Sequence, residues 1–249
     1  MAGLITLYKN AALTQELSDG SWLQSMILPT VTLPGSGTTS TTGVVAYGLN
    51  NGTTAMLDVY IQPTAGGGIH GSDFVSNLQI APDVQGSPGS YGSSGSNVLV
   101  YSGSLLPSTS EPNANSTSPA VSNPSAAPTL AAVGTTSNLG SGIYTVAYSY
   151  TNGGGETLVS TSATITLTAG QAIRVAPISL TTDATGINYY MSAIPNRTEL
   201  YKASAGTGST VVLTRADGFF RFWARQVVDY NDPTGYYKAQ LTVNSVDIG

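Results

Sequence analysis

Asp229 and Asp232 are a pair of carboxylates whose spacing could support chemistry, because they lie together in the segment Asp-Tyr-Asn-Asp-Pro at 229–233. Most glycosidases use two carboxyl groups, one as general acid and the other as nucleophile or general base. With Asn231 they also offer oxygen ligands for calcium, although the spacing of an EF-hand loop is absent. Asp and Asn close to proline more often bind their own backbone in turns. We therefore expect a turn, and keep the calcium site and the catalytic pair as alternatives.

His70 is the only histidine and would have to be the general base of any Ser-His hydrolase. It lies between Gly66-Gly67-Gly68 and Gly71-Ser72, and no serine has the Gly-x-Ser-x-Gly context of a nucleophile elbow. We expect an ordinary loop histidine. The sequence thus predicts a protein that is not an enzyme, with no catalytic residue, no cofactor and no metal.

The densest aromatic cluster of the chain spans residues 219–225, Phe-Phe-Arg-Phe-Trp-Ala-Arg. Arg221, Trp223 and Arg225 alternate along it, so on a strand they share one face and a guanidinium could stack on the indole. One interpretation is an edge strand whose exposed face is shielded by arginine stems. The other is a contact between subunits formed by Phe219, Arg221, Trp223 and Arg225, since aromatic residues and arginine are enriched at interfaces.

Charged residues make up only 8% of the 249 residues, and the net charge is −5. Eight Lys and Arg spread over the chain give no basic stripe, so nucleic acid is not an expected partner. Cysteine is absent, which excludes a disulfide framework and thiolate metal sites. We expect neither a signal peptide nor a membrane span. A surface so poor in charge favours permanent incorporation in an assembly, although a secreted adhesin would share it.

Residues 1–106 read as an all-β domain, because short apolar runs alternate with turn chemistry. The runs cover Val44–Tyr47, Ala55–Ile61, Phe74–Ile80 and Asn97–Tyr101, with turns expected at 50–52, 65–68 and 86–95. In the second run Leu57, Val59 and Ile61 are predicted to line one face, with Asp58 pointing away. Pro82 is predicted to end the third run.

Residues 107–125 are rich in Pro, Ser, Thr, Asn and Ala and read as an extended linker. After it, Tyr144, Val146, Tyr148 and Tyr150 fall on one face of a strand, and the other face is not strongly polar either. The glycine-rich turn at 152–156 then leads to a strand at 163–168 with apolar and hydroxyl residues alternating. These two strands are predicted to form a hairpin of a β-sandwich.

The segment from residue 126 to 215 resembles the immunoglobulin-like modules of tailed-bacteriophage virion proteins. The resemblance is carried by the segments 144–150, 155–157, 169–173 and 186–190, with the sequences YTVAYSY, GET, AGQAI and GINYY. It implies an antiparallel β-sandwich without the disulfide of antibody domains. Residues 216–249 are too few for a third domain and need a host sheet, which is either the neighbouring module or residues 1–106. We expect them to complete residues 1–106 as a discontinuous β-sandwich platform, into which the module is inserted.

The resemblance implies a decoration protein of a virion, made in the host cytoplasm, that docks by its platform and projects its module outward. The expected partners are other virion proteins, such as the major capsid or tail protein, further copies of the chain in a homo-oligomer, and surface glycans. A tail or baseplate adhesin that binds host glycans is the first alternative. A capsule-degrading enzyme is the second. The tyrosines of the module are expected to serve packing rather than stacking on sugars.

Overall fold

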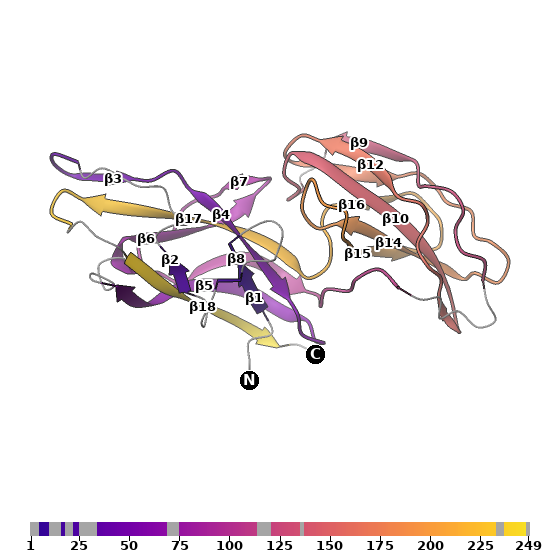
Figure 1. Cartoon of the computed structure of the whole chain (residues 1–249), viewed down its shortest axis with the longest axis horizontal. Helices are drawn as coiled ribbons and strands as arrows, with labels where there is room; N and C mark the ends of the chain where they lie inside the picture. Colours follow the sequence, from indigo (N-terminus) through magenta and orange to yellow (C-terminus); the bar gives the residue numbers. More distant parts are fainter. Residues whose placement is uncertain are drawn as a thin grey trace. The chain divides into compact units, whose positions relative to one another are not determined.

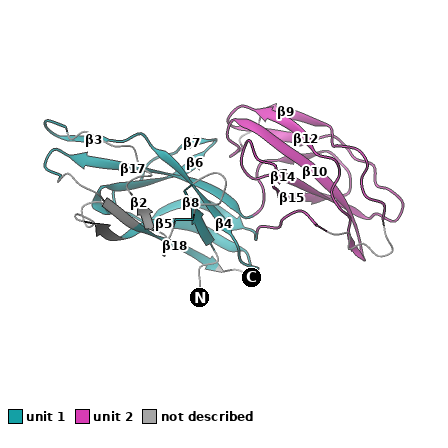
Figure 2. Cartoon of the chain, viewed as in Figure 1, with its two compact units in different colours: residues 1–107, 218–249 teal, residues 108–217 magenta. Residues whose placement is uncertain are grey.

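The protein is all-β, as the sequence predicts, in the computed structural model shown in Figure 1. The structure describes residues 5–9, 16–17, 22–24, 34–68, 75–113, 121–134, 137–232 and 237–247. The chain divides into two compact units (Figure 2). The first unit is discontinuous and comprises residues 1–107 and 218–249, and the second comprises residues 108–217.

The first unit is a sandwich of two antiparallel sheets. The first sheet has the order β1-β4-β17-β6-β7, with β3 also pairing β17, and consists of β1 (Ile5–Tyr8), β3 (Thr38–Ser40), β4 (Val44–Asn50), β6 (Leu78–Val84), β7 (Ser87–Pro88) and β17 (Phe219–Asp229). The second has the order β2-β18-β5-β8 and consists of β2 (Trp22–Gln24), β5 (Met56–Gly68), β8 (Val98–Leu105) and β18 (Tyr237–Asp247). The C-terminal strands β17 and β18 thus each lie inside a sheet built by the N-terminal residues.

Side chains from both sheets form one apolar core between them. Leu78, Ile80 and Phe222 of the first sheet pack in the same cluster as Val59 and Ile61 of the second, and all five side chains are fully buried. Burial of each such side chain contributes about 1.5–3 kcal/mol. The core explains why residues 218–249 need residues 1–107, since neither segment buries its apolar face without the other.

Strand β6 continues through Pro82 to Val84, so the prediction that Pro82 ends this strand is wrong. The N–H and C=O of one residue point to the same side of an antiparallel strand. The carbonyl of Pro82 accepts the Gly89 N–H, on the side away from β17. The N–H that proline lacks would also have pointed away from β17. The pairing of β6 with β17 therefore loses no hydrogen bond at Pro82. The glycine-rich loop also donates to β6 from Gly92 and Gly95, and so covers this edge.

Leu57 faces outward, whereas the sequence predicts it to share a face with Val59 and Ile61. The pairing of β5 with both neighbours shifts register at this point, and Asp58 adopts a φ of 48°. The bulge turns Leu57 to the opposite face, where it is 38% exposed. The glycines at 66–68, predicted as a turn, also belong to β5 and pair with β18.

The second unit also contains two antiparallel sheets. One has the order β11-β10-β14-β15, with β12 also pairing β10, and consists of β10 (Gly142–Asn152), β11 (Gly155–Glu156), β12 (Ala163–Leu167), β14 (Gly186–Ser192) and β15 (Leu200–Gly206). The other has the order β16-β13-β9 and consists of β9 (Leu130–Gly134), β13 (Gln171–Val175) and β16 (Val211–Leu213). The predicted hairpin is confirmed, because β10 pairs β12 in the register Tyr144↔Ile165.

Of the predicted linker at 107–125, the described residues from 108 onward belong to the second unit, so they are not an extended linker. Thr109 and Glu111 hydrogen-bond with Lys202 and Leu200, which continues the sheet beyond β15. Val121 is 2% exposed. Composition alone predicts a linker here because these residues lack an apolar period, but backbone pairing at a sheet edge does not require one.

Candidate interaction surfaces

Strand β17 carries the four residues predicted as a subunit contact, and it is not the edge strand of the alternative interpretation. It pairs β4 on one side and β6 on the other. Phe219 is buried at 7% exposure, while Arg221, Trp223 and Arg225 are half-buried and share one face of the strand. The predicted alternation of Arg221, Trp223 and Arg225 is therefore present, on a central strand.

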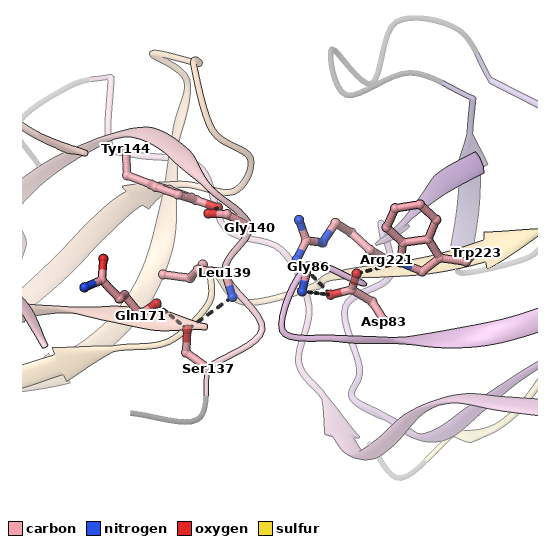
Figure 3. Close-up of polar contacts among 9 residues, drawn as sticks. All are labelled: Asp83, Gly86, Ser137, Leu139, Gly140, Tyr144, Gln171, Arg221 and Trp223. Carbon is pink, nitrogen blue, oxygen red and sulfur yellow. Dashed lines mark hydrogen bonds and ion pairs between the residues drawn. The ribbon is translucent and has the colours of Figure 1, made fainter. Parts of the chain in front are cut away.

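The carboxylate of Asp83 binds two of these side chains at once (Figure 3). Nη2 of Arg221 donates to Oδ2 at 2.7 Å, and Nε1 of Trp223 donates to Oδ1 at 2.8 Å. The Gly86 N–H adds a third bond at 3.2 Å to Oδ2. The Asp83 side chain is only 4% exposed, so the ion pair is well desolvated.

Arg225 is held by β6 and by the loop that follows β7. Its Nε donates to Oε1 of Gln79 at 2.8 Å, and its guanidinium lies 4.0 Å above the ring centre of Tyr91. The sequence suggests Trp223 as the stacking partner, but Tyr91 provides the ring. Burial raises the pKa of Tyr91, and the positive charge of Arg225 opposes this shift.

Glycine at position 43 makes room for Tyr91. A Cβ placed on Gly43 would lie 2.0 Å from the Tyr91 hydroxyl, which is buried without a hydrogen-bond partner among the described residues. The row of Arg221, Trp223 and Arg225 is thus bound within its own sheet and loop. A role of these residues in subunit contacts stays a prediction.

A second surface lies on the outer face of the second sheet, and the sequence does not predict it. Three cross-strand rows cover it: Val246, Leu57 and Ser104; Asn244, Tyr60 and Leu99; Thr242 and Gln62. We call these eight residues the neutral face, since none of them is an acidic or basic residue. Leu57, Leu99 and Val246 are exposed at 38%, 36% and 61%.

The bulge at Asp58 creates the apolar part of the neutral face. Asp58 accepts the Gly103 N–H at 2.7 Å through Oδ1, and Gly103 has a φ of 93°. This bond joins β5 to β8 and fixes the register in which Leu57 opposes Ser104 and Val246. Only the sequence Leu-Asp-Val at 57–59 could have signalled it, because a single Asp interrupts an apolar run.

The acidic pair at 229 and 232 forms the expected turn. Oδ1 of Asp229 accepts the Asn231 N–H at 3.0 Å, and Oδ2 of Asp232 accepts both the Asp229 N–H and Nδ2 of Asn77 at 2.7 Å each. These carboxylate oxygens are therefore bound to the protein itself. His70 and Pro233 lie outside the described residues.

The second unit contains a polar cluster that the sequence does not predict, centred on Glu156. Its Oε1 accepts hydrogen bonds from the Tyr190 hydroxyl at 2.6 Å, from Nδ2 of Asn188 at 2.9 Å and from the Ser149 hydroxyl. Burial and the bond to Glu156 raise the pKa of Tyr190. The cluster connects β11 to β10 and β14.

Most tyrosines of the second unit are buried, as the sequence predicts. Exposure is 5% or less for Tyr144, Tyr148, Tyr150, Tyr189 and Tyr190, and Tyr201 is half-buried. The Tyr144 hydroxyl donates to the Gly140 carbonyl at 3.2 Å (Figure 3). Buried rings of this kind stabilise the sandwich and are not available for stacking on a sugar.

Within the described ranges, no three His, Cys, Asp or Glu side chains gather where a metal ion could bind. The same residues include no helix with the length and apolar character needed to cross a membrane. Comparison of the chain with models of protein families, with curated proteins and with solved structures finds no match.

Proposed function

We propose that the chain is a non-enzymatic structural component of a tailed-phage virion, a decoration protein that docks through the neutral face of its first unit. Its partner on the particle is another virion protein, the major capsid protein. The immunoglobulin-like second unit is the projecting module. The resemblance of residues 126–215 to virion modules supports the class of protein, and the neutral face supports the mode of docking.

The observation that carries the docking mode is the exposure of Leu57, Leu99 and Val246 on neighbouring strands. Burial of apolar surface contributes about 25 cal/mol per Å² and requires no partner charge. In the neutral face, the polar groups of Tyr60 and Asn244, which lie in the middle row, can form hydrogen bonds with a partner. Such a face fits a partner by shape and apolar contact, which suits a protein with few charges.

An adhesin is less well supported, because the tyrosines that would contact a glycan are mostly buried. Copy number separates the two roles. A head decoration protein requires many more copies per particle than a tail-tip adhesin. Densitometry of purified particles against the major capsid protein measures this ratio, and a ratio of only a few copies per particle would contradict the decoration role.

A charge placed in the neutral face tests the docking mode. We expect Val246→Lys to reduce occupancy on particles that lack the wild-type protein by about tenfold or more, because docking would desolvate the new ammonium group. Val84→Lys is the matched control: Val84 is 48% exposed in β6, in the other sheet of the same unit. Both variants should melt like the wild type. Equal, undiminished binding of both variants would exclude docking through the neutral face.

A further inference from the structure

The sequence contains two Asn-Gly dipeptides, Asn51-Gly52 and Asn152-Gly153, and the structure holds them in different ways. Asn-Gly is the dipeptide most open to attack of a backbone nitrogen on the preceding side-chain amide, since glycine has no Cβ to hinder the approach. Whether the attack occurs depends on the freedom of the nitrogen and on the environment of the amide oxygen.

Asn152 ends β10, and Gly153 and Gly154 connect it to β11. The Gly154 N–H donates to Oδ1 of Asn152 at 2.8 Å. Gly153 is exposed, a Cβ on it would have no atom within 4 Å, and its N–H has no hydrogen bond among the described residues. The nitrogen is thus free to react, and the oxygen that would gain negative charge already has a donor.

In Asn51-Gly52 both reacting groups, the attacking nitrogen and the leaving amide nitrogen, are held by hydrogen bonds. The Gly52 N–H donates to Oδ1 of Asn50 at 2.9 Å, and Asn50 is fully buried. Asn50 is itself fixed, because its Nδ2 donates to the carbonyls of Thr54 and Leu105 at 3.0 Å each. Nδ2 of Asn51, the leaving group, donates to the Thr6 hydroxyl at 2.7 Å. For the Gly52 nitrogen to reach Cγ of Asn51, the peptide between the two residues would have to rotate, and this rotation would break these hydrogen bonds.

We propose that Asn152-Gly153 is a self-modification site at which the folded hairpin converts Asn152 to aspartate and isoaspartate. The Gly153 nitrogen loses its proton to a solvent base and attacks Cγ of Asn152. The intermediate expels Nδ2 as ammonia and leaves a five-membered imide. Water then opens the imide at either carbonyl, so the overall reaction consumes one water and releases one ammonia. Water is the only co-reactant.

The product adds a negative charge at the tip of the hairpin in a protein whose net charge is −5. Isoaspartate also inserts an extra carbon into the backbone beside the Thr151↔Glu156 pair. The hydrogen bonds that converge on Glu156 should loosen as a result. This inference is independent of the proposed docking function, because it concerns the second unit and needs no partner.

The test compares the two dipeptides in one sample of the full chain. The protein is incubated at mildly alkaline pH in ¹⁸O-labelled water, digested, and analysed by mass spectrometry for deamidation and label uptake. We expect the peptide with Asn152 to react about tenfold or more faster than the peptide with Asn51, since about tenfold is the factor that the net contribution of one hydrogen bond gives. In denaturant the two rates should become equal. Equal rates in the folded protein, or a difference that persists in denaturant, would overturn the proposal.

A variant separates the reaction from damage to the fold. Gly153→Ala places a methyl group on the attacking residue, in open space and at a φ that L residues adopt. It should melt like the wild type and deamidate several-fold more slowly at Asn152, with the rate at Asn51 unchanged. A folded Gly153→Ala variant that deamidates at the wild-type rate would exclude attack by this nitrogen.

Discussion

The indole nitrogen of Trp223 donates a 2.8 Å hydrogen bond to Asp83, the same carboxylate that forms the ion pair with Arg221. The two donors use different oxygens, so the carboxylate bridges positions 221 and 223 of β17 from its place in β6. Asp83 is 138 residues from Arg221 and 140 residues from Trp223 in the sequence. It therefore ties the C-terminal part of the first unit to the N-terminal part.

Asp83→Asn should destabilise the first unit by about 1.5–3 kcal/mol, because it removes the negative charge that pairs with the half-buried Arg221 and accepts the Trp223 N–H. An asparagine amide has one oxygen and one NH2 group. In either orientation its NH2 group would face a donor, either Nη2 of Arg221 or Nε1 of Trp223, and one hydrogen bond would be lost. Urea unfolding of the full chain, followed by tryptophan fluorescence, measures the loss. Asp183→Asn is the control: Asp183 is exposed and has a φ of 67°, which asparagine tolerates. A loss equal to that of the control would show that the ion pair contributes nothing.

Gly48→Ala should also destabilise the first unit. Gly48 of β4 lies opposite Phe220 of β17, and a Cβ on Gly48 would lie 2.0 Å from the Phe220 ring. Because Phe220 belongs to the core, the ring cannot move without repacking, and we expect a loss of about 1–3 kcal/mol. Gly35→Ala, with open space and no positive φ, should be neutral or slightly stabilising. Thermal unfolding of both variants compares them, and equal melting would contradict this packing.

Periodic signals in the sequence predict elements well where both faces of a strand are specified. The segment 144–150 alternates tyrosine and valine with small residues, so neither face is strongly polar, and in β10 these residues are buried on both faces. The segment 219–225 likewise forms a strand with Phe220 and Phe222 in the core. In both strands each local choice of residue agrees with the packing.

The sequence does not predict features that depend on distant partners. Leu57 faces outward because Asp58 binds a backbone N–H 45 residues away, and the only local signal of this bulge is the single Asp within an apolar run. The glycines at 66–68 favour a turn by propensity, but pairing with β18 extends them. Asp83 belongs to no motif, so its role is recognisable only after β6 and β17 are adjacent. Candidate sites in this chain depend on such pairings, and spacing alone cannot reveal them.

The second unit should lose stability at alkaline pH through its buried tyrosines. Burial and a hydrogen bond to Tyr150 raise the pKa of Tyr148 to about 12, and the pKa of Tyr190 also lies above its ordinary value. Between about pH 10 and 12 the unfolded chain ionises tyrosine while the folded chain keeps the proton, so unfolding becomes more favourable as pH rises. Below about pH 10 both states are protonated, and no loss is expected.

Tyr148→Phe tests this pH dependence. The variant should be less stable at neutral pH, because it loses the hydrogen bond between its hydroxyl and Tyr150, but its stability should fall less steeply above about pH 10 than that of the wild type. Tyr230→Phe, at an exposed tyrosine, should leave the slope unchanged. Urea unfolding at a series of pH values gives the slopes, and parallel curves for the wild type and Tyr148→Phe would refute the assignment.

Glu156→Gln should destabilise the second unit, because three donors converge on the single oxygen Oε1 and a neutral amide oxygen attracts them less strongly than a carboxylate. We expect a loss of about 1.5–3 kcal/mol in urea unfolding. Glu199→Gln, at an exposed glutamate, should cost little. A double-mutant cycle with Tyr190→Phe then isolates the bond between the two side chains. Strictly additive losses would contradict the cluster, whereas a coupling near 1 kcal/mol fits a charge-assisted hydrogen bond at a partly buried site.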